Sequence, residues 1–408
     1  MTKKEFRNLI QDHPVYLDGA TGTNLQECGM PDKVCTEKWI EEHPELLRKL
    51  QEAYIEAGAQ ILYAPTFSAN RIRLKEYGLE AEVQSLNENL VKLTKSVSKG
   101  RVLVAGDMAT TGKFIIPAGM LTFEEAVDIY KEQIRCLTDA GVDLLGIETM
   151  LSLQETRAAL IAAKESSDLP VMVSMTFNKE GITLFGTKPE TAVVVLQELG
   201  ADAVGVNCSE GPDKMIPIIE KMKPYARIPI IAKANAGLPT VTNEGKIRYD
   251  MGETEFAEYA VGLVNAGANL LGGCCGTKPS YIEAIITSTK DQVLKKTLDI
   301  PECLATERNI FPCKTPINEH MVKEICDADD SKEACEALIN KEYDAFDECV
   351  MYMDTPLCLK IDDPDILEAG LRRYPGRAVV NTTHADAEIQ GKSRDLARKY
   401  GAVFMETN

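Results

Sequence analysis

Short runs of apolar and β-branched residues alternate with longer segments in which apolar residues recur every three or four positions, from residue 15 to about residue 290. The short runs predict buried parallel strands, and the longer segments predict the crossover helices that such strands require. Eight strands are expected, beginning at Val15, Ile61, Val102, Asp143, Pro170, Ala203, Pro229 and Asn269. These repeats predict a (β/α)₈ barrel. The alternative is an open doubly wound sheet, but no strand is followed by a GxGxxG phosphate turn.

Two of the expected helices carry clear start and stop signals. Residues 43–59 place their apolar side chains on one helical face. Residues 121–141 begin with Thr122, and Glu125 follows three positions later, which is the pattern of a capping box. Both segments end with a glycine next to an alanine, and the similar sequence Ala-Gly-Ala at residues 266–268 precedes the last strand. Glycine readily closes a helix, so these positions predict the turns that lead into the following strands.

The alternation breaks around residues 290–320, where prolines accumulate. We therefore place a domain boundary there and expect a barrel over residues 1–300 and a small α/β appendage over residues 301–408. Helices are expected at 332–340, 365–373 and 390–399, and strands at 356–362, 377–381 and 402–406. These elements are too few to close a second barrel. A truncated gene product is one reading of this short segment.

The composition indicates a globular protein with a sizeable core, since 44% of residues are hydrophobic and 26% are charged. The formal net charge of -18 argues against binding to nucleic acids or anionic membranes, because phosphate groups would be repelled. No apolar run approaches the roughly 18 residues that a membrane span needs. The N-terminal residues lack the apolar core and cleavage site of a signal peptide. We expect a cytoplasmic protein.

Cysteine is the residue type most suited to metal chemistry in this chain. Twelve cysteines are present, and in reducing cytosol they are better explained as free thiols or metal ligands than as disulfides. Only four histidines are available, which leaves few candidates for a histidine-based site. Any metal site is therefore expected to use sulfur.

Three cysteines are placed at the expected ends of strands. Cys208 ends the sixth strand, and Cys274 and Cys275 end the eighth within a glycine-rich turn. The C-terminal ends of barrel strands open onto one face, where active sites form. Three thiolates there would hold Zn²⁺ at about 2.3 Å each and leave one position open. The alternative is three buried cysteines that never meet.

An open position on such a zinc site would suit a thiol substrate. A free thiol has a pKa near 8.5 and is mostly protonated at neutral pH. Coordination removes the proton and leaves a nucleophilic sulfur, so zinc would serve to generate the nucleophile. The sequence thus predicts zinc-dependent chemistry on a thiol.

Five motifs together resemble the homocysteine S-methyltransferase family. They are LDGATGTNLQ from Leu17, APTFSAN from Ala64, GIETM from Gly146, GVNCSEG around Cys208 and GGCCGT around Cys274 and Cys275. The resemblance covers about residues 10–290, with the motifs in the expected order. Within the family, AKANAGLP from Ala232 is most similar to the homocysteine-binding domain of cobalamin-dependent methionine synthases.

The resemblance implies roles for particular residues. Cys208, Cys274 and Cys275 match the zinc ligands of the family. Two acidic residues, Asp18 and Glu148, match those that hold the amino group of homocysteine, a role that suits carboxylates facing an ammonium. Thr66 matches a residue that lines the same pocket, and Asn235 is a candidate to hold the vacant zinc position. Without such roles, Asp18 would be a turn former and Glu148 an exposed charge at a strand end.

The C-terminal segment resembles the middle strands of a pterin-binding methyltransferase barrel. Asp362 and Asn381 stand where that family holds the pterin ring. The segment has room for only about half a barrel and lacks the later strands, so folate binding is not the favoured reading. The favoured alternative is a remnant that packs on the barrel or mediates self-association, which would give a homodimer.

The resemblance implies methyl transfer to homocysteine, giving methionine. The chain contains no cobalamin-binding DxHxxG segment. We therefore expect methylcobalamin to be the donor on a separate corrinoid protein. S-methylmethionine- and betaine-type donors remain open, as does a different thiol acceptor. A zinc-keeping binding protein without catalytic activity is the alternative from another functional class.

Overall fold

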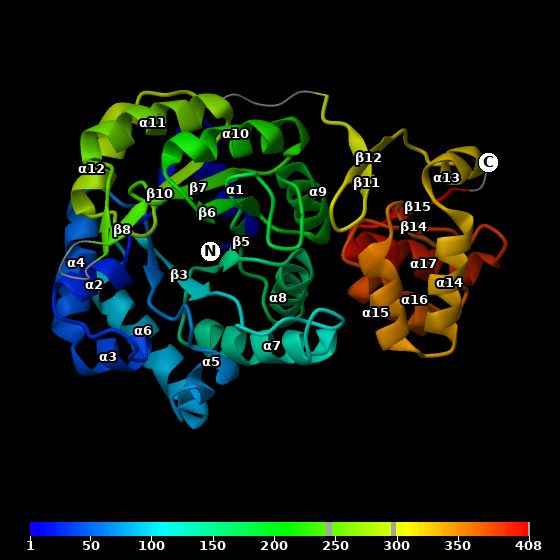
Figure 1. Ribbon diagram of the computed structural model, residues 1–408, viewed down its shortest axis with the longest axis horizontal. Helices are drawn as coiled ribbons and strands as arrows, with labels where there is room; N and C mark the ends of the chain where they lie inside the picture. Colours follow the sequence, from blue (N-terminus) through cyan, green and yellow to red (C-terminus); the bar gives the residue numbers. More distant parts are fainter. Residues whose placement is uncertain (242–246, 295–298, 407–408) are drawn as a thin grey trace.

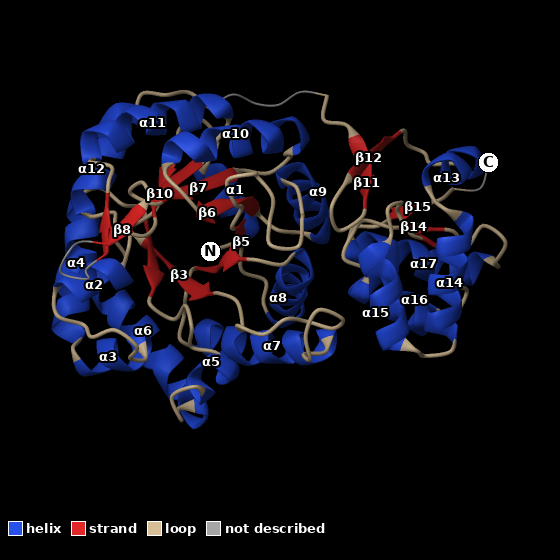
Figure 2. Cartoon of the chain, in the orientation of Figure 1, coloured by secondary structure: helices blue, strands red, loops and turns tan. Residues whose placement is uncertain are grey.

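The computed structural model describes residues 1–241, 247–294 and 299–406 (Figure 1). Its larger part is a ring of parallel strands surrounded by helices, which Figure 2 shows in red and blue. Strand order around the ring is β1-β10-β7-β6-β5-β4-β3-β2. The strands are β1 (Val15–Tyr16), β2 (Ile61–Ala64), β3 (Leu103–Met108), β4 (Leu144–Met150), β5 (Val171–Met175), β6 (Ala203–Cys208), β7 (Ile230–Ala234) and β10 (Leu270–Gly273). All eight expected strands are confirmed.

The ring closes between β1 and β2. Leu17 and Ile61 form a parallel bridge, and the Asp18 amide donates to the Ile61 carbonyl at 3.1 Å. Closure satisfies the backbone groups that an open sheet would leave at its edges. The predicted (β/α)₈ barrel is therefore confirmed, and the doubly wound alternative is wrong.

Helices on the outside of the ring connect the strands and bury the apolar faces that the sequence predicts. Thr122 and Glu125 form the expected capping box of α7, and Gly141 closes the turn after it with φ +85°. Strand side chains such as Val104, Val173 and Val206 are fully buried. Burial of each such side chain contributes about 1.5–3 kcal/mol to folding. The helices are α1 (Lys3–Leu9), α2 (Gly22–Glu27), α3 (Thr36–Glu42), α4 (Pro44–Glu56), α5 (Arg71–Lys75), α6 (Val83–Ser98), α7 (Phe123–Asp139), α8 (Leu153–Ser166), α9 (Pro189–Leu199), α10 (Pro212–Met222), α11 (Glu253–Ala266) and α12 (Pro279–Thr289).

The C-terminal segment begins with an antiparallel hairpin and continues as a small parallel sheet with helices around it. The sheet has the order β13-β14-β15, and its strands and the helices predicted from the sequence are confirmed. The hairpin, α13 and α15 were not predicted. The elements are β11 (Glu302–Ala305), β12 (Ile310–Cys313), α13 (Glu319–Ile325), α14 (Ala328–Ile339), α15 (Tyr343–Tyr352), β13 (Cys358–Leu359), α16 (Pro364–Arg373), β14 (Val379–Val380), α17 (Ala387–Tyr400) and β15 (Val403–Phe404).

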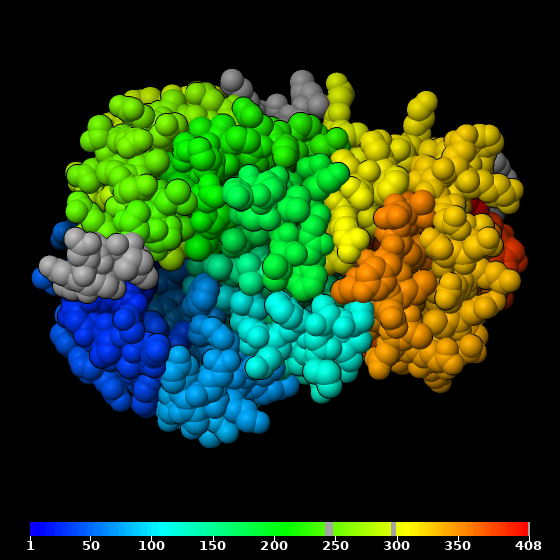
Figure 3. Space-filling model, in the orientation of Figure 1, coloured from blue at the N-terminus to red at the C-terminus, as the bar shows by residue number. Residues whose placement is uncertain are grey.

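The C-terminal segment packs directly against the barrel (Figure 3). Arg157 of α8 is buried, and its guanidinium donates to the carbonyls of Leu371 and Arg372 at 2.9 Å each, at the end of α16. The Arg372 side chain reaches back to Glu124 of α7 at 2.8 Å. A buried cation thus satisfies helix carbonyls that would otherwise lack partners.

No helix in the described residues is both long enough and apolar enough to cross a lipid bilayer.

Replacing this buried arginine should loosen the contact between the two parts. We expect Arg157→Leu to lower the free energy of unfolding by about 2 kcal/mol, because two buried carbonyls lose their donors. Urea denaturation followed by circular dichroism measures the change. Arg398→Leu is the matched control, since Arg398 is 76% exposed in an i,i+3 pair and should cost less than about 0.5 kcal/mol. Equal effects of the two substitutions would contradict the role given to Arg157.

Candidate metal centre and substrate pocket

Three cysteine sulfurs converge at the C-terminal end of the barrel strands. The Sγ atoms of Cys208, Cys274 and Cys275 all lie within 4.8 Å of one another. Strand register brings them together, because Ala234 of β7 pairs with Cys208 on one side and with Gly273 on the other. The geometric prediction is confirmed, and the alternative of three cysteines that never meet is wrong.

Tight backbone turns aim these sulfurs at one point. Cys208 has a left-handed φ of +61°, a conformation that costs a non-glycine residue about 1–3 kcal/mol. Gly273 has no room for a side chain, since a Cβ there would lie 2.1 Å from the Thr277 hydroxyl. Gly276 follows with φ +81°. The expected glycine-rich bend therefore allows two consecutive cysteines to face the same point.

The three thiols perturb one another strongly. The hydrogen bond between Cys274 and Cys208 lowers the pKa of Cys208 and raises that of Cys274. The bond between Cys208 and Cys275 lowers the pKa of Cys275 and raises that of Cys208, while burial raises the pKa of all three. The pKa values of Cys208 and Cys275 rise to about 11 and 12, and that of Cys274 is also raised.

This donor set fits a zinc ion. Three sulfur atoms held this close together are the ligands that Zn²⁺ prefers, and a divalent cation would replace the protons that the raised pKa values retain. Asn235 lies beside the cluster, where its side chain bonds to Cys208 and its buried Oδ1 has no partner. No other group of three potential histidine, cysteine or carboxylate ligands was found in the described residues.

A group of buried acidic side chains, which we call the acidic pocket, lies at the same end of the barrel. Asp18 follows β1 and is 2% exposed, and Glu148 on β4 is 7% exposed. The structure thus buries both carboxylates, which excludes the reading of Glu148 as an exposed charge. Asp18 accepts from the Tyr63 amide at 2.8 Å through Oδ2, while its Oδ1 is buried without a partner. Burial raises the pKa of Asp18 to about 7, although the charge of Lys233 lowers it.

Two charged residues of the pocket were missed by sequence reasoning. Lys233 on β7 is buried, donates to Glu148 at 2.5 Å and lies 3.6 Å from the centre of the Tyr63 ring. Asp107 on β3 is also buried, its Oδ1 has no partner, and burial followed by the charge of Glu148 raises its pKa. A charged residue inside an otherwise apolar strand is the signal that could have identified both.

Thr66 lies just after β2 and is fully buried. Its hydroxyl donates to the Asp107 carbonyl at 2.7 Å and accepts from the Asp107 amide at 3.1 Å. This hydroxyl joins the ends of two neighbouring strands at the acidic pocket. Its expected role in lining the pocket stays a prediction.

The two residues expected to contact a pterin lie at neighbouring strand ends in the C-terminal segment, away from the cysteines. Asp362 follows β13 and Asn381 follows β14, and the Asn381 amide donates to the Leu359 carbonyl at 2.9 Å. Asp362 is 47% exposed and pairs with His384 at 3.0 Å. The Asn381 side chain accepts from the Thr383 hydroxyl at 2.9 Å.

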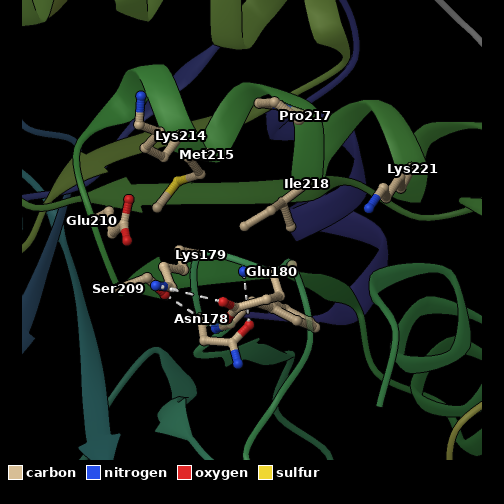
Figure 4. Close-up of a pocket in the computed structure, with 12 residues that line it drawn as sticks. Asn178, Lys179, Glu180, Ser209, Glu210, Lys214, Met215, Pro217, Ile218 and Lys221 are labelled. Atoms are coloured by element: carbon tan, nitrogen blue, oxygen red, sulfur yellow. Dashed lines mark hydrogen bonds and ion pairs between the residues drawn. The ribbon is translucent and has the colours of Figure 1, made fainter. Parts of the chain in front are cut away.

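A cavity of about 130 Å³ lies beside Ser209 and Glu210 (Figure 4). Ser209 and Glu210, which directly follow Cys208, line one end of it, and α10 lines the other through residues such as Met215 and Ile218. The cysteines and the buried carboxylates do not line this cavity. It is therefore a neighbour of the acidic pocket and not part of it.

Comparisons with known proteins agree with this geometry. The chain is 26% identical to methionine synthase of Mycobacterium leprae (strain TN) in an alignment 451 positions long, which covers 95% of this chain and 37% of that protein. It is 25% identical to methionine synthase of Mycobacterium tuberculosis (strain ATCC 25618 / H37Rv), covering 98% of this chain and 38% of that protein. The chain thus spans less than two fifths of the length of these relatives.

The fold is also found in solved structures of homocysteine methyltransferase MmuM from Escherichia coli. The oxidized form matches with a TM-score of 0.59 and 22% identity, covering 70% of this chain and 99% of that one. The metallated form matches with a TM-score of 0.59 and 23% identity, covering 69% of this chain and 98% of that one. The family model for homocysteine S-methyltransferase matches residues 15–288, from β1 into α12. The chain therefore belongs to the homocysteine S-methyltransferase family.

Proposed function

We propose that this chain transfers a methyl group to the thiol of homocysteine and so forms methionine. One observation carries the proposal, which is that three cysteine sulfurs meet at the mouth of a barrel that also holds a buried acidic pocket. The sulfurs suit capture of a thiol, and the carboxylates suit capture of an ammonium. Homocysteine carries both groups on one short chain.

Cys208, Cys274 and Cys275 would hold a zinc ion. When bound, zinc would lower the pKa of the substrate thiol so that it reacts as a thiolate. The chain then needs no general base for this proton. The sulfur of homocysteine would attack the methyl carbon in line, so that a new S–C bond forms while the donor leaves with the electron pair of the bond that breaks.

Asp18 and Glu148 would bind the ammonium group of homocysteine. Lys233 already pairs with Glu148 in the free protein, but the buried Oδ1 atoms of Asp18 and Asp107 lack partners. An arriving ammonium would supply hydrogen-bond donors for these atoms and offset the excess negative charge. The pocket would thereby fix the amino-acid end of the substrate while the sulfur faces the methyl donor.

A methylated corrinoid protein is the donor that we favour. The similarity to methionine synthases and the AKANAGLP sequence support it. S-methylmethionine- and betaine-type donors are the alternatives.

We infer that residues 1–300 and 301–408 are two domains, and that the second supports the barrel. Its contacts with α7 and α8 favour this role over pterin binding. Asp362 is paired with His384, and Asn381 is bonded to Thr383, so both expected pterin contacts are engaged within the segment.

Removing any one sulfur should abolish metal binding at the centre. We expect wild-type protein to hold one zinc per chain and Cys208→Ser, Cys274→Ser and Cys275→Ser to hold less than about a tenth of that, with methionine formation reduced about 1,000-fold. Metal analysis after dialysis measures the content. Cys28→Ser is the control, because Cys28 is exposed and outside the cluster, and it should match wild type. Full zinc content in a cluster variant would contradict the assignment.

The affinity for homocysteine should depend on the ionisation of Asp18. Its pKa of about 7 in the empty pocket means that the carboxyl is largely neutral at pH 6 and ionised at pH 8. The KM for homocysteine should therefore fall several-fold as the pH rises across this range. Asp18→Asn should raise KM about 10–100-fold and flatten this slope, because an amide has no charge to gain. An unchanged slope in the variant would assign the dependence to another group.

Donor preference can be tested directly with the zinc-loaded protein. We expect methionine formation with a methylated corrinoid carrier to exceed the rate with S-methylmethionine or betaine by at least about tenfold, because a carrier can present its methyl group at the barrel mouth. Mass spectrometry of the methionine product measures each rate. A higher rate with either small-molecule donor would replace the corrinoid assignment. Zinc without turnover for any donor would favour a binding protein.

A further inference from the structure

Asn207 is a buried amide that contacts Cys274 of the cysteine cluster and Thr149, the residue that follows Glu148. It directly precedes Cys208 at the end of β6 and is fully buried. Its Oδ1 accepts from the Thr149 amide and from the Ser174 hydroxyl, at 2.8 Å each. Its Nδ2 donates to the Thr149 hydroxyl at 2.7 Å and points to Cys274 Sγ at 4.0 Å. The amide therefore uses both of its lone pairs and both of its N–H bonds.

Thr149 needs the support that Asn207 provides. It has a left-handed φ of +58°, which is unfavourable for a β-branched residue. The β4–β5 ladder also shifts its register between Ile147 and Met150, so regular strand pairing does not hold this residue. Two hydrogen bonds with Asn207 hold the Thr149 amide and the Thr149 hydroxyl instead. Because Glu148 is the preceding residue, the conformation of Thr149 sets the direction in which the Glu148 carboxylate leaves the strand.

The contact with Cys274 links the same amide to the sulfur cluster. A donor close to a sulfur ligand orients that ligand and stabilises its thiolate form. Asn207 also directly precedes the left-handed turn at Cys208 and Ser209, which have φ +61° and +63°. A single side chain is thus connected to Glu148 through Thr149 and to one of the three sulfurs, that of Cys274.

We propose that Asn207 is a positioning residue that couples the metal ligands to the ammonium-binding carboxylate. This inference rests on the proposed function, since it assigns Asn207 to the two halves of one substrate site. Asn207 holds Cys274 and, through Thr149, Glu148 in fixed positions relative to each other. A side chain with a purely structural role would instead lower stability without separate effects on zinc and substrate.

The test uses the full chain and compares three variants. Asn207→Asp keeps the acceptor oxygen but loses both N–H donors, so zinc affinity should fall at least about tenfold and the KM for homocysteine should rise at least about tenfold. Thr149→Gly should remain within about threefold of wild type in both, because glycine adopts a positive φ without support. The double variant Asn207→Asp with Thr149→Gly should recover most of the KM while its zinc affinity stays low.

Zinc affinity is measured by competition with a chromogenic chelator, and the sulfur environment by the thiolate charge-transfer band of the cobalt-substituted protein. The inference is overturned if Asn207→Asp leaves either zinc affinity or KM unchanged, or if the double variant recovers neither.

If Asn207→Asp does not fold, Thr149→Val takes its place. Loss of the hydroxyl should raise KM several-fold with zinc affinity within twofold of wild type, and an unchanged KM overturns the inference. Wild-type protein that binds no zinc would overturn the proposed function as well, whereas zinc-bound wild type with unaffected variants overturns this inference alone.

Discussion

The register of three neighbouring strands is the constraint on which the site depends. β7 lies between β6 and β10, and Ala234 pairs with Cys208 on one side and Gly273 on the other. Sulfurs separated by more than sixty residues along the chain therefore emerge at the same height. A shift of one residue in either pairing would turn a cysteine to the opposite face of its strand, because side chains alternate along a strand. Closure of the barrel fixes this register from both sides.

The charges of the acidic pocket are close to what one ammonium can balance. Three carboxylates, those of Asp18, Asp107 and Glu148, share the barrel end with the single ammonium of Lys233. Burial raises the pKa of Asp18 to about 7 and also raises that of Asp107, which shows that burial disfavours the charged forms of these carboxyls. Without Lys233 the cost of burying these carboxylates together would be much larger. The lysine therefore offsets part of the negative charge that the barrel buries here.

Much of the fold and the sulfur cluster could be predicted from the sequence, for a physical reason. Buried parallel strands appear as nearly continuous apolar runs, and their ends must share one face of a barrel, so the position of Cys208 relative to Cys274 was already informative. Lys233 and Asp107 were missed because a charge inside such a run has no visible partner until the strands are assembled. Asn207 was missed because its partners lie on β4, β5 and β10. The hairpin of β11 and β12 was hidden by its short strands and by Pro312.

Three of the seven described non-glycine residues with positive φ lie where the proposed chemistry takes place. Thr149, Cys208 and Ser209 all have positive φ values at the C-terminal ends of β4 and β6, at the mouth of the barrel. Each such residue costs about 1–3 kcal/mol and persists only when its surroundings determine its conformation. The closed ring of buried strands and the hydrogen bonds of the Asn207 amide hold these backbone conformations. The sulfurs and the Glu148 carboxylate are therefore in place before any ligand arrives. A site built in this way does not have to order its own groups when the substrate binds, and more of the binding free energy remains to align the sulfur with the methyl group.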